Sequence, residues 1–332
     1  MKSLSFGYKV LFFFNNIFAI LLLFAYLTSY ISPASLPILA ILNFSIPILW
    51  GINLLFALIW LLKLKKHIFL SLIVIALGWF HFQKLFVFSK ADEVKDEGLK
   101  VMSYNIMQFY NLEDKKKSTH EDIKAFVIIE NPAILCLQEL KKTKQPVLNY
   151  FKYKTSYSSE QNLQTAIYSQ YPIFNQKLFD FGISNNSAVM ADIVVKKDSI
   201  RVFSVHFESL NIDMIKNQLE EKMLKRLQKT FSRQIDQFEM LNDHISSSPY
   251  PVIFCADMNN TAMSYLYRQV IDEGLKDTFL ESGYQYGNTF NFKKLPLRID
   301  MIFIDENLKS FNFKNYTVNY SDHFPVMVEI QL

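Results

Sequence analysis

The first 90 residues contain three apolar runs separated by short polar stretches. The runs are Tyr8–Tyr30, Leu36–Leu62 and Ile68–Phe80. A helix that crosses a bilayer needs roughly 20 apolar residues, so the first two runs are long enough. The third reaches that length only if it continues through Phe82–Phe88, with the Lys84 ammonium extended toward the membrane surface. The pattern predicts a membrane anchor over residues 1–90 with about three transmembrane helices.

Beyond the anchor, short β-type runs alternate with helical ones. Strands are predicted at Leu99–Tyr104, Ala133–Leu137, Ala166–Ser169, Ala188–Val195, Ile200–Val205, Val252–Cys255, Ile299–Ile304 and Val326–Ile330. Helices are predicted from Ser118 to just before Pro132, and over Met214–Ile245, where apolar residues recur close to every 3.6 positions. Continuously apolar strands are typical of sheets covered by helices. We expect an α/β domain at 99–332, with a two-sheet core flanked by helices, after a charged linker at 91–98.

Charge divides the chain at the same place. The net charge is +4, but residues 1–90 hold seven Lys and no Arg, Asp or Glu. The remainder therefore holds 28 Lys and Arg against all 31 acidic residues, a net charge of −3. Lysines precede the first run and fill the Lys63–His67 loop, so the positive-inside rule places both in the cytoplasm. Three spans then put the domain outside the cytoplasm. If the third run enters the membrane without crossing it, the domain lies on the cytoplasmic side.

Composition excludes several classes of protein. Half of the residues are hydrophobic, and only two Cys and eight Gly are present, which excludes a disordered chain, a collagen and a disulfide scaffold. Cys136 and Cys255 lie three and two positions before acidic residues at strand ends. Strand alternation predicts that the two thiols point in different directions relative to those acids, so we expect buried free thiols.

Polar residues stop or precede the predicted strands. They are Asn105, Gln138, Glu139, His206, Asp257, Asn259, Arg298, Asp300, Ser321, Asp322 and His323. If one edge of the sheets gathers them, it holds several carboxylates, two amides and two imidazoles. Carboxylate oxygens suit Mg²⁺, Mn²⁺ or Ca²⁺ better than zinc, and a His beside an Asp is held in one tautomer. This set fits metal-assisted phosphoryl transfer or phosphodiester hydrolysis.

Taken singly, each of these residues also has a structural explanation. Asn105 could be a turn residue, and Asp257 and Asn259 could cap the helix that follows them. Arg298 and Asp300 could form a surface ion pair of little energetic value. The structural explanations together require several coincidences in register, which favours the catalytic interpretation.

Seven motifs, in order and spacing, resemble the endonuclease/exonuclease/phosphatase family. They read VMSYN, LQE, AIYSQYPI, VHFES, ADMN, RIDMIF and SDHFPV. The resemblance covers about residues 98–332. It implies a four-layer α/β/β/α sandwich of two packed mixed sheets and a metal-dependent phosphodiesterase or phosphatase activity. The family usually reads Gly-Asp-Phe-Asn where this chain has Ala256-Asp257-Met258-Asn259, which keeps the two chemical residues and affects only local packing.

The resemblance implies a role for each matched residue near the metal ion and the nucleophile. Asn105 and Glu139 hold the metal ion, which is expected to be Mg²⁺, with Mn²⁺ or Ca²⁺ as alternatives. Asp322 lies close to the metal site. Asp257 orients or deprotonates the attacking water, and Asn259 donates hydrogen bonds to the phosphoryl oxygens.

It also implies roles around the phosphate and the leaving group. His323 contacts the phosphate and stabilises its developing charge, while Asp300 fixes the His323 ring. His206 is the candidate general acid for the leaving group. The segment that ends in Thr289 and Phe290 resembles the family's substrate-side loop, so these two are candidate substrate-binding residues.

The expected substrate is a lipid head group or a small phosphodiester rather than nucleic acid. A duplex-DNA binder usually shows a basic stripe, whereas this domain carries −3 and has separate lysine clusters at 115–117, 141–144 and 222–226. A hydrolase tethered to a bilayer meets lipid head groups at high effective concentration. The alternatives are an endonuclease or exonuclease acting on extracellular DNA or RNA, and a catalytically inactive membrane scaffold. We expect a monomer.

Overall fold

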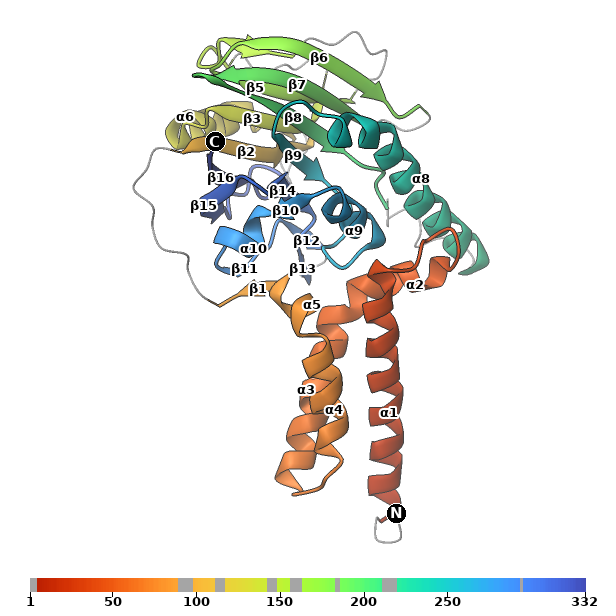
Figure 1. Ribbon diagram of the computed structural model, residues 1–332. Helices are drawn as coiled ribbons and strands as arrows, with labels where there is room; N and C mark the ends of the chain where they lie inside the picture. Colours follow the sequence, from red (N-terminus) through yellow and green to blue (C-terminus); the bar gives the residue numbers. More distant parts are fainter. Residues whose placement is uncertain are drawn as a thin grey trace.

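A computed structural model of the chain describes residues 5–88, 98–110, 117–141, 148–155, 163–182, 186–210, 220–292 and 295–332. The linker expected at 91–98 lies outside these residues except for its last position. The beginning of the helix expected at Met214–Ile245 also lies outside them, as do parts of the lysine clusters at 115–117 and 141–144. Within the described part, an α/β domain lies at one end of a bundle of helices (Figure 1).

The bundle is formed by the N-terminal segment. Its elements are α1 (Phe6–Tyr26), η1 (Leu27–Ser29), α2 (Pro37–Leu42), η2 (Asn43–Ser45), α3 (Ile46–Leu62), α4 (Ile68–Leu77) and α5 (Trp79–Gln83). Two helical stretches of 24 residues each, Phe6–Ser29 and Leu39–Leu62, are long and apolar enough to cross a membrane, by length and composition alone. Such stretches also occur as buried core helices and as signal sequences.

The expectation of about three transmembrane helices needs correction, because the third apolar run does not form one long helix. α4 covers 10 residues and stops at Gly78, where α5 begins. The Phe82–Phe88 stretch does not extend a span either. Its residues Phe86–Val87 form β1, which pairs with β11 (Gln285–Tyr286) of the α/β domain.

Hydrogen bonds join helices α1, α3 and α4 of the bundle. The Asn15 side chain on α1 donates to Ser71 Oγ on α4 at 2.8 Å and accepts from Trp60 Nε1 on α3 at 2.8 Å. The amide of Asn53 on α3 also donates to the Phe18 carbonyl at 3.2 Å. Polar side chains buried among apolar helices are stabilised only when they are paired, so these contacts fix how the helices face one another.

The domain contains two six-stranded mixed sheets, in the orders β10-β14-β9-β8-β7-β6 and β15-β16-β2-β3-β5-β4. Their strands are β2 (Leu99–Asn105), β3 (Ile134–Lys141), β4 (Tyr153–Lys154), β5 (Leu163–Ser169), β6 (Ile173–Asp180), β7 (Ser187–Val195), β8 (Asp198–His206), β9 (Val252–Asp257), β10 (Leu275–Asp277), β14 (Asp300–Asp305), β15 (Lys309–Asn315) and β16 (Val326–Gln331). β2 and β3 run parallel, as do β8 and β9, and the other neighbours are antiparallel. Two short strands, β12 (Phe290–Phe292) and β13 (Leu295–Leu297), form a separate hairpin.

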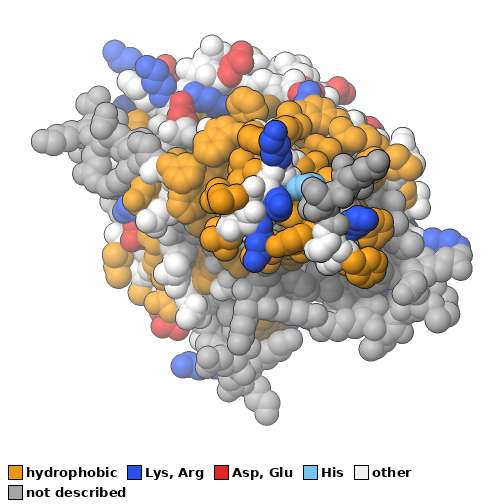
Figure 2. Space-filling view, turned by 90° about the horizontal axis from the view of Figure 1, so that it is seen from below, with side chains coloured by type: hydrophobic (Ala, Val, Ile, Leu, Met, Phe, Trp, Pro, Cys, Tyr) orange, Lys and Arg blue, Asp and Glu red, His pale blue; other side chains and the backbone are white. Residues whose placement is uncertain are grey.

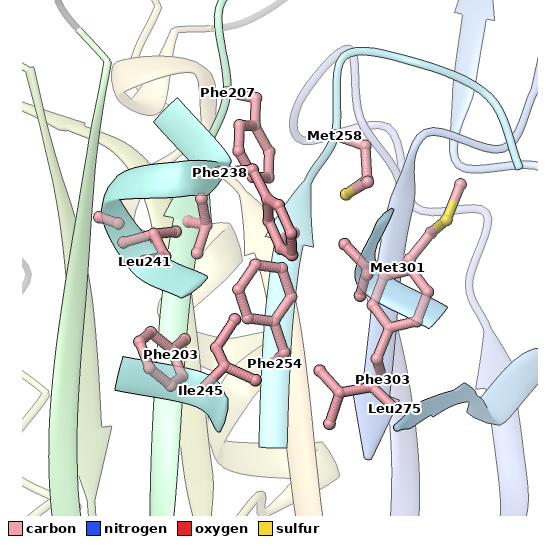
Figure 3. Packing of buried hydrophobic residues seen from close by; sticks show 14 of the residues in the cluster. Phe203, Phe207, Phe238, Leu241, Ile245, Phe254, Met258, Leu275, Met301 and Phe303 are labelled. Atoms are coloured by element: carbon pink, nitrogen blue, oxygen red, sulfur yellow. The ribbon is translucent and has the colours of Figure 1, made fainter. Parts of the chain in front are cut away.

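Helices cover the outer faces of both sheets, which confirms the predicted sandwich of two mixed sheets. α6 (His120–Glu130) covers the sheet that contains β2. α8 (Glu220–Ser246) and α9 (Tyr265–Asp272) cover the sheet that contains β9, while η3 (Met107–Phe109) and α10 (Thr278–Ser282) are short connections. Where α8 covers the sheet, the rings of Phe207, Phe238 and Phe254 lie side by side (Figure 3). The centroid of the Phe254 ring lies 6.4 Å from that of Phe207 and 6.4 Å from that of Phe238.

A third buried cluster fills the space between the two sheets and holds both cysteines, which are free. Both thiols are free and buried, as predicted. The prediction that they point in different directions is wrong, because Cys136 and Cys255 both lie in this inter-sheet cluster. The alternation fails at Glu139, which has a left-handed φ of 53° where the register of β3 against β5 shifts. A bulge of this kind adds one residue and changes the face on which the following side chains lie.

Strand boundaries differ from the prediction mainly where polar residues continue a strand. Gln138 and Glu139 do not end their strand, because β3 runs on to Lys141. The sequence pattern also missed two edge strands. β6 is mostly exposed and polar, and in β15 polar residues alternate with two phenylalanines, so neither has a continuous apolar run.

Candidate active site

Three strands of one sheet bring His206, Asp257 and Asp300 into a single row. His206 ends β8 and pairs in register with Asp257, which ends β9. Asp257 pairs on its other side with Asp300, the first residue of β14. All three side chains are buried. The residues that sequence analysis expected at one edge of the sheets therefore lie side by side.

The second sheet contributes Asn105 and Glu139 to the same edge. Asn105 ends β2, and its Nδ2 donates to Asp257 Oδ2 at 2.9 Å and to Glu139 Oε1 at 3.3 Å. Its Oδ1 accepts a hydrogen bond from the backbone N–H of Met107. Because one buried amide bridges carboxylates from both sheets, it sets the spacing between them. The bulge at Glu139 directs this carboxylate toward the edge, and bulges are frequent beside active sites.

Asn259 lies two residues beyond Asp257 in a left-handed conformation, with φ of 46°. Its backbone N–H donates to Asp257 Oδ1 at 2.9 Å, and its side-chain Nδ2 donates to the Phe207 carbonyl at 3.0 Å. A residue other than Gly in this region carries a conformational cost of about 1–3 kcal/mol and persists where surrounding contacts hold it. The turn thus positions a half-exposed amide beside Asp257.

The last strand is preceded by His323, whose ring faces Asp300. His323 Nδ1 lies 2.9 Å from Asp300 Oδ2, and Nε2 lies 3.8 Å from Asp257 Oδ2. Burial alone would lower the pKa of His323, but the Asp300 and Asp257 carboxylates raise it well above its ordinary range. Burial also raises the pKa of Asp300 to about 6, against the opposing effect of His323. The proton of this pair belongs on the imidazole at neutral pH.

The two candidate substrate-binding residues lie next to this pair. The buried Thr289 Oγ1 accepts hydrogen bonds from the backbone N–H groups of Ile299 and Asp300, both at 3.0 Å. The half-exposed Phe290 packs its ring on the His323 ring, with centroids 4.8 Å apart. Thr289 therefore holds Asp300 in place, whereas the Phe290 ring borders the site.

The residues that adjoin His323 and Asp300 along the chain make contacts of their own. Asp322 is half-buried and accepts a 3.3 Å hydrogen bond from Ser321 Oγ. Ser321, to which no role was given, also donates to the Asn105 carbonyl at 2.8 Å, and its place in the SDHFPV motif was the available signal. Arg298 does not form a surface pair with Asp300. It is buried and binds Asp277 through its two terminal guanidinium nitrogens, at 3.2 and 2.7 Å, while its Nε donates to the Lys84 carbonyl at 3.1 Å.

The site has the properties of a cation-binding centre. Within the described part of the chain, ligand atoms of Asp257, Asp300 and His323 all lie within 4.8 Å of one another. His206 Nε2 is buried without a hydrogen-bond partner, 3.6 Å from Asp257 Oδ2 and 3.7 Å from Glu139 Oε1. Buried carboxylates this close repel one another unless a cation or a proton compensates them. Their oxygens are donors that fit a hard divalent cation.

Two family models match the chain. One, described as the Endonuclease/Exonuclease/phosphatase family, matches residues 102–323. The other, described as a domain of unknown function, DUF8431, matches residues 8–85. The boundary between the two matches agrees with the division between the helical bundle and the α/β domain. Comparison with curated protein sequences gives no match.

Solved structures share the fold at low sequence identity. An endonuclease/exonuclease/phosphatase from Beutenbergia cavernae is 14% identical with a TM-score of 0.55, over 71% of this chain and 72% of the other. TDP2 from D. rerio, solved with a single-strand DNA product, is 16% identical with a TM-score of 0.53, over 71% and 100%. A mannosyl-6-phosphatase from Bacteroides thetaiotaomicron is 17% identical with a TM-score of 0.52, over 70% and 100%.

Proposed function

Because the chain belongs to the endonuclease/exonuclease/phosphatase family, we propose that it is a membrane-anchored, divalent-metal-dependent hydrolase of phosphoester or phosphodiester bonds. The observation that carries the proposal is the buried edge where Asp257 lies within reach of Asn105, His206 and His323. Enzymes of phosphoryl transfer need this combination of carboxylates, amides and imidazoles, because charge develops on both the attacking and the leaving oxygen.

Glu139 and Asn105 are the proposed metal-holding residues, with Asp322 close to the metal site. The bound cation, proposed to be Mg²⁺ with Mn²⁺ or Ca²⁺ as alternatives, would supply Lewis-acid polarisation of a phosphoryl oxygen. The partly exposed Glu139 carboxylate, with 24% of its side chain accessible, supports this assignment because a ligand can reach it from solvent. The Asn105 amide holds Glu139 and Asp257 at a fixed spacing.

The remaining residues have proposed roles in moving protons and stabilising charge. Asp257 accepts the proton of the attacking water or orients it, and Asn259 donates to the phosphoryl oxygens. Protonated His323, held by Asp300, stabilises the negative charge that develops on the phosphoryl group. His206 donates a proton to the leaving oxygen, and its unpaired Nε2 is free to do so.

The helical bundle is the proposed membrane anchor, and the surface of the bundle supports this. Large apolar side chains on its outer face are exposed, including Phe6 at 82%, Leu54 at 62% and Leu62 at 73%. Seen from the end of the bundle, hydrophobic side chains surround a few central Lys or Arg side chains (Figure 2). A surface of this kind on one part of a protein indicates a membrane or a partner.

We place the α/β domain on the extracytoplasmic side of a multi-pass anchor. The first residues of α1 and the lysine-containing turn between α3 and α4 lie at the same end of the bundle, and the domain lies at the opposite end (Figure 1). The third crossing is therefore proposed to consist of two short helices, α4 and α5, which are broken at Gly78 and together lead from that turn back to the domain, with Asn15 binding α4 to α1. The positive-inside rule then orients the bundle with its lysines in the cytoplasm.

A phosphoester in a lipid head group or a small phosphodiester is the proposed substrate class. The loops that carry the site adjoin the bundle, since the Met263 carbonyl accepts from Ser29 Oγ at 2.6 Å and the Gly287 N–H donates to the Leu85 carbonyl at 3.4 Å. A substrate at the membrane surface therefore meets the site at high effective concentration. Nucleic acid is the second candidate, because TDP2 from D. rerio was solved with a DNA product.

Hydrolysis of bis-p-nitrophenyl phosphate by the purified full-length chain with Mg²⁺ tests the activity. We expect Glu139→Ala to lower kcat/KM by about 10²-fold or more, as loss of a charge-stabilising group does. Asp198→Asn, which changes an exposed acid at the β7–β8 turn, should leave the rate unchanged. Activity that survives Glu139→Ala would refute the metal assignment, and inactivity of the unmodified chain on any phosphoester would favour a scaffold.

The substrate class and the topology need separate experiments. A panel of sphingomyelin, phosphatidylinositols, p-nitrophenyl esters and plasmid DNA compares lipid, small-molecule and nucleic-acid substrates directly. Nicking of DNA without lipid cleavage would replace the proposed substrate class by nucleic acid. Protease digestion of intact cells should cleave the α/β domain if it is extracytoplasmic. Protection of the domain in intact cells, with cleavage after permeabilisation, would reverse the orientation.

A further inference from the structure

The segment 258–263, termed the catalytic loop, connects Asp257 to α9 and contains Asn259. On the domain side, two backbone contacts hold its start. The Met258 N–H donates to the Ile299 carbonyl at 2.8 Å, and the Asn259 N–H donates to Asp257 Oδ1. The rest of the loop lies against the helical bundle, so its position depends on contacts from both parts of the chain.

Asn43, in the short η2 helix of the bundle, contacts the loop at two points. Its Nδ2 donates to Asn260 Oδ1 at 3.0 Å, and its Oδ1 accepts from Thr261 Oγ1 at 3.1 Å. Asn43 is 1% exposed and Asn260 is 3% exposed. Both side chains are therefore out of reach of water. Without Asn43, Asn260 Oδ1 would keep only the Thr261 N–H as a donor, and the Thr261 hydroxyl would lose its buried acceptor.

The contacts continue from Asn260 into the α/β domain. Asn260 Nδ2 donates to Gln234 Oε1 on α8 at 2.9 Å. Gln234 Nε2 donates in turn to the Met258 carbonyl at 3.3 Å, at the start of the loop. Asn43, Asn260 and Gln234 thus form a buried chain of amides that begins in the bundle and ends beside Asp257.

Two further features fix the other end of the loop. Thr28 and Ser29, at the end of the first long helix, both donate from Oγ to the Met263 carbonyl, at 3.1 and 2.6 Å. The Met263 side chain is fully buried in the hydrophobic cluster of the bundle, where it packs with residues such as Leu22 and Ile46. The bundle therefore supplies both polar and apolar contacts to a segment of the active site.

We infer that the helical bundle holds the catalytic loop in its active conformation and that Asn43 is a positioning residue for the hydrolysis. Asn43 holds Asn260, and through it the left-handed turn at Asn259, in the conformation that aims the Asn259 amide beside Asp257. A strained turn persists only where its surroundings over-determine it, and these contacts do so from the bundle side. The activity part of this inference rests on the proposed function, whereas the structural part does not.

The first test compares two buried Asn→Ala variants of the full-length chain in detergent micelles. Asn43→Ala removes both contacts to the loop. Asn53→Ala is the matched control, because this buried amide donates only to Phe18 and Leu49 carbonyls within the bundle. With bis-p-nitrophenyl phosphate, which needs no membrane, we expect Asn43→Ala to lower kcat by about tenfold with little change in KM, and Asn53→Ala to leave kcat unchanged. Equal kcat values in the two variants would overturn the inference.

The second test makes the loop itself the readout. Hydrogen–deuterium exchange of the peptide that contains 258–263 should be faster in Asn43→Ala than in Asn53→Ala. Thr261→Val removes the hydroxyl that donates to Asn43 Oδ1, together with its contact to the Met263 N–H inside the loop, with little change in shape. Because the contact of Asn43 to Asn260 remains, this variant should have an intermediate effect on both kcat and exchange. The Thr261→Val variant serves in place of Asn43→Ala in both tests if Asn43→Ala does not fold. Unchanged exchange in the loop would refute the positioning role whether or not the chain is active.

These readouts separate the two proposals. If the unmodified chain hydrolyses no phosphoester, the proposed function fails, and loop exchange still decides whether Asn43 holds the loop. If the unmodified chain is active, kcat is referred to the concentration of folded protein measured by circular dichroism, because loss of folded protein also lowers the apparent kcat at constant KM. A tenfold drop per folded molecule then indicates positioning.

Discussion

Arg298→Met is expected to destabilise the α/β domain strongly, because it leaves a buried charge unpaired. Arg298 and Asp277 have side chains that are 3% and 1% exposed, and both terminal guanidinium nitrogens bind the carboxylate. In Arg298→Met, the Asp277 carboxylate would keep only the Tyr267 hydroxyl and the Phe279 N–H as donors. Breaking a buried pair in this way costs about 3–5 kcal/mol.

Thermal unfolding of the full-length chain, followed by circular dichroism, measures this effect. A loss of this size corresponds to a fall in Tm of roughly 10 °C for a domain of about 230 residues. The double variant Arg298→Met/Asp277→Leu removes both charges and should recover much of the stability, since apolar residues often replace a buried ion pair without loss. Lys314→Met is the control, because its pair with Glu130 is solvent-exposed and should contribute less than about 1 kcal/mol.

Two results would refute this reasoning about Arg298. One is a fall in Tm that is no larger in Arg298→Met than in Lys314→Met. This would mean that the Asp277 carboxylate becomes hydrated or protonated in the variant at no cost in the free energy of unfolding. The other is a double variant that is no more stable than Arg298→Met. In that case the guanidinium would act mainly through packing on the Phe279 ring, which lies 4.7 Å away, and not through its charge.

Three further predictions follow from the site and the core. Activity that requires protonated His323 is present below the raised pKa of His323 and is lost as pH rises through that pKa. Asp300→Asn removes the carboxylate that raises this pKa most, so it should move the alkaline limb of the kcat/KM profile to lower pH, and an unmoved limb contradicts this. Phe254→Ala should lower the free energy of unfolding by about 3–5 kcal/mol in urea titrations because it leaves a cavity under α8, and a loss below about 1 kcal/mol would show that the core collapses around it. Saturating Mg²⁺ should raise the Tm of the unmodified chain by several degrees and that of Glu139→Ala much less, and equal shifts would place the ion elsewhere.

The residues of the candidate site were accessible from the sequence because they follow a local pattern. Each polar residue that stops an apolar strand, such as Asn105, His206 or Asp257, lies at a strand end, and parallel strands bring such ends to one edge. The apolar face of α8 was likewise visible, since Leu227, Phe231 and Phe238 recur at helical spacing and are all buried. In both cases a short stretch of chain contains the whole signal.

The partners of Arg298, Glu139 and Asn43 were decided only by the tertiary structure. Arg298 binds Asp277, 21 residues away, and not the nearby Asp300, because the strands place Asp277 beneath it. Glu139 points to the site through a bulge that alternation does not predict. Asn43 reaches Asn260 across 217 residues. The sequence by itself determined which segments are apolar and where strands stop, because those are properties of neighbours along the chain. Only packing decided which distant polar groups are buried against one another, because burial forces each to find a partner wherever the fold brings one.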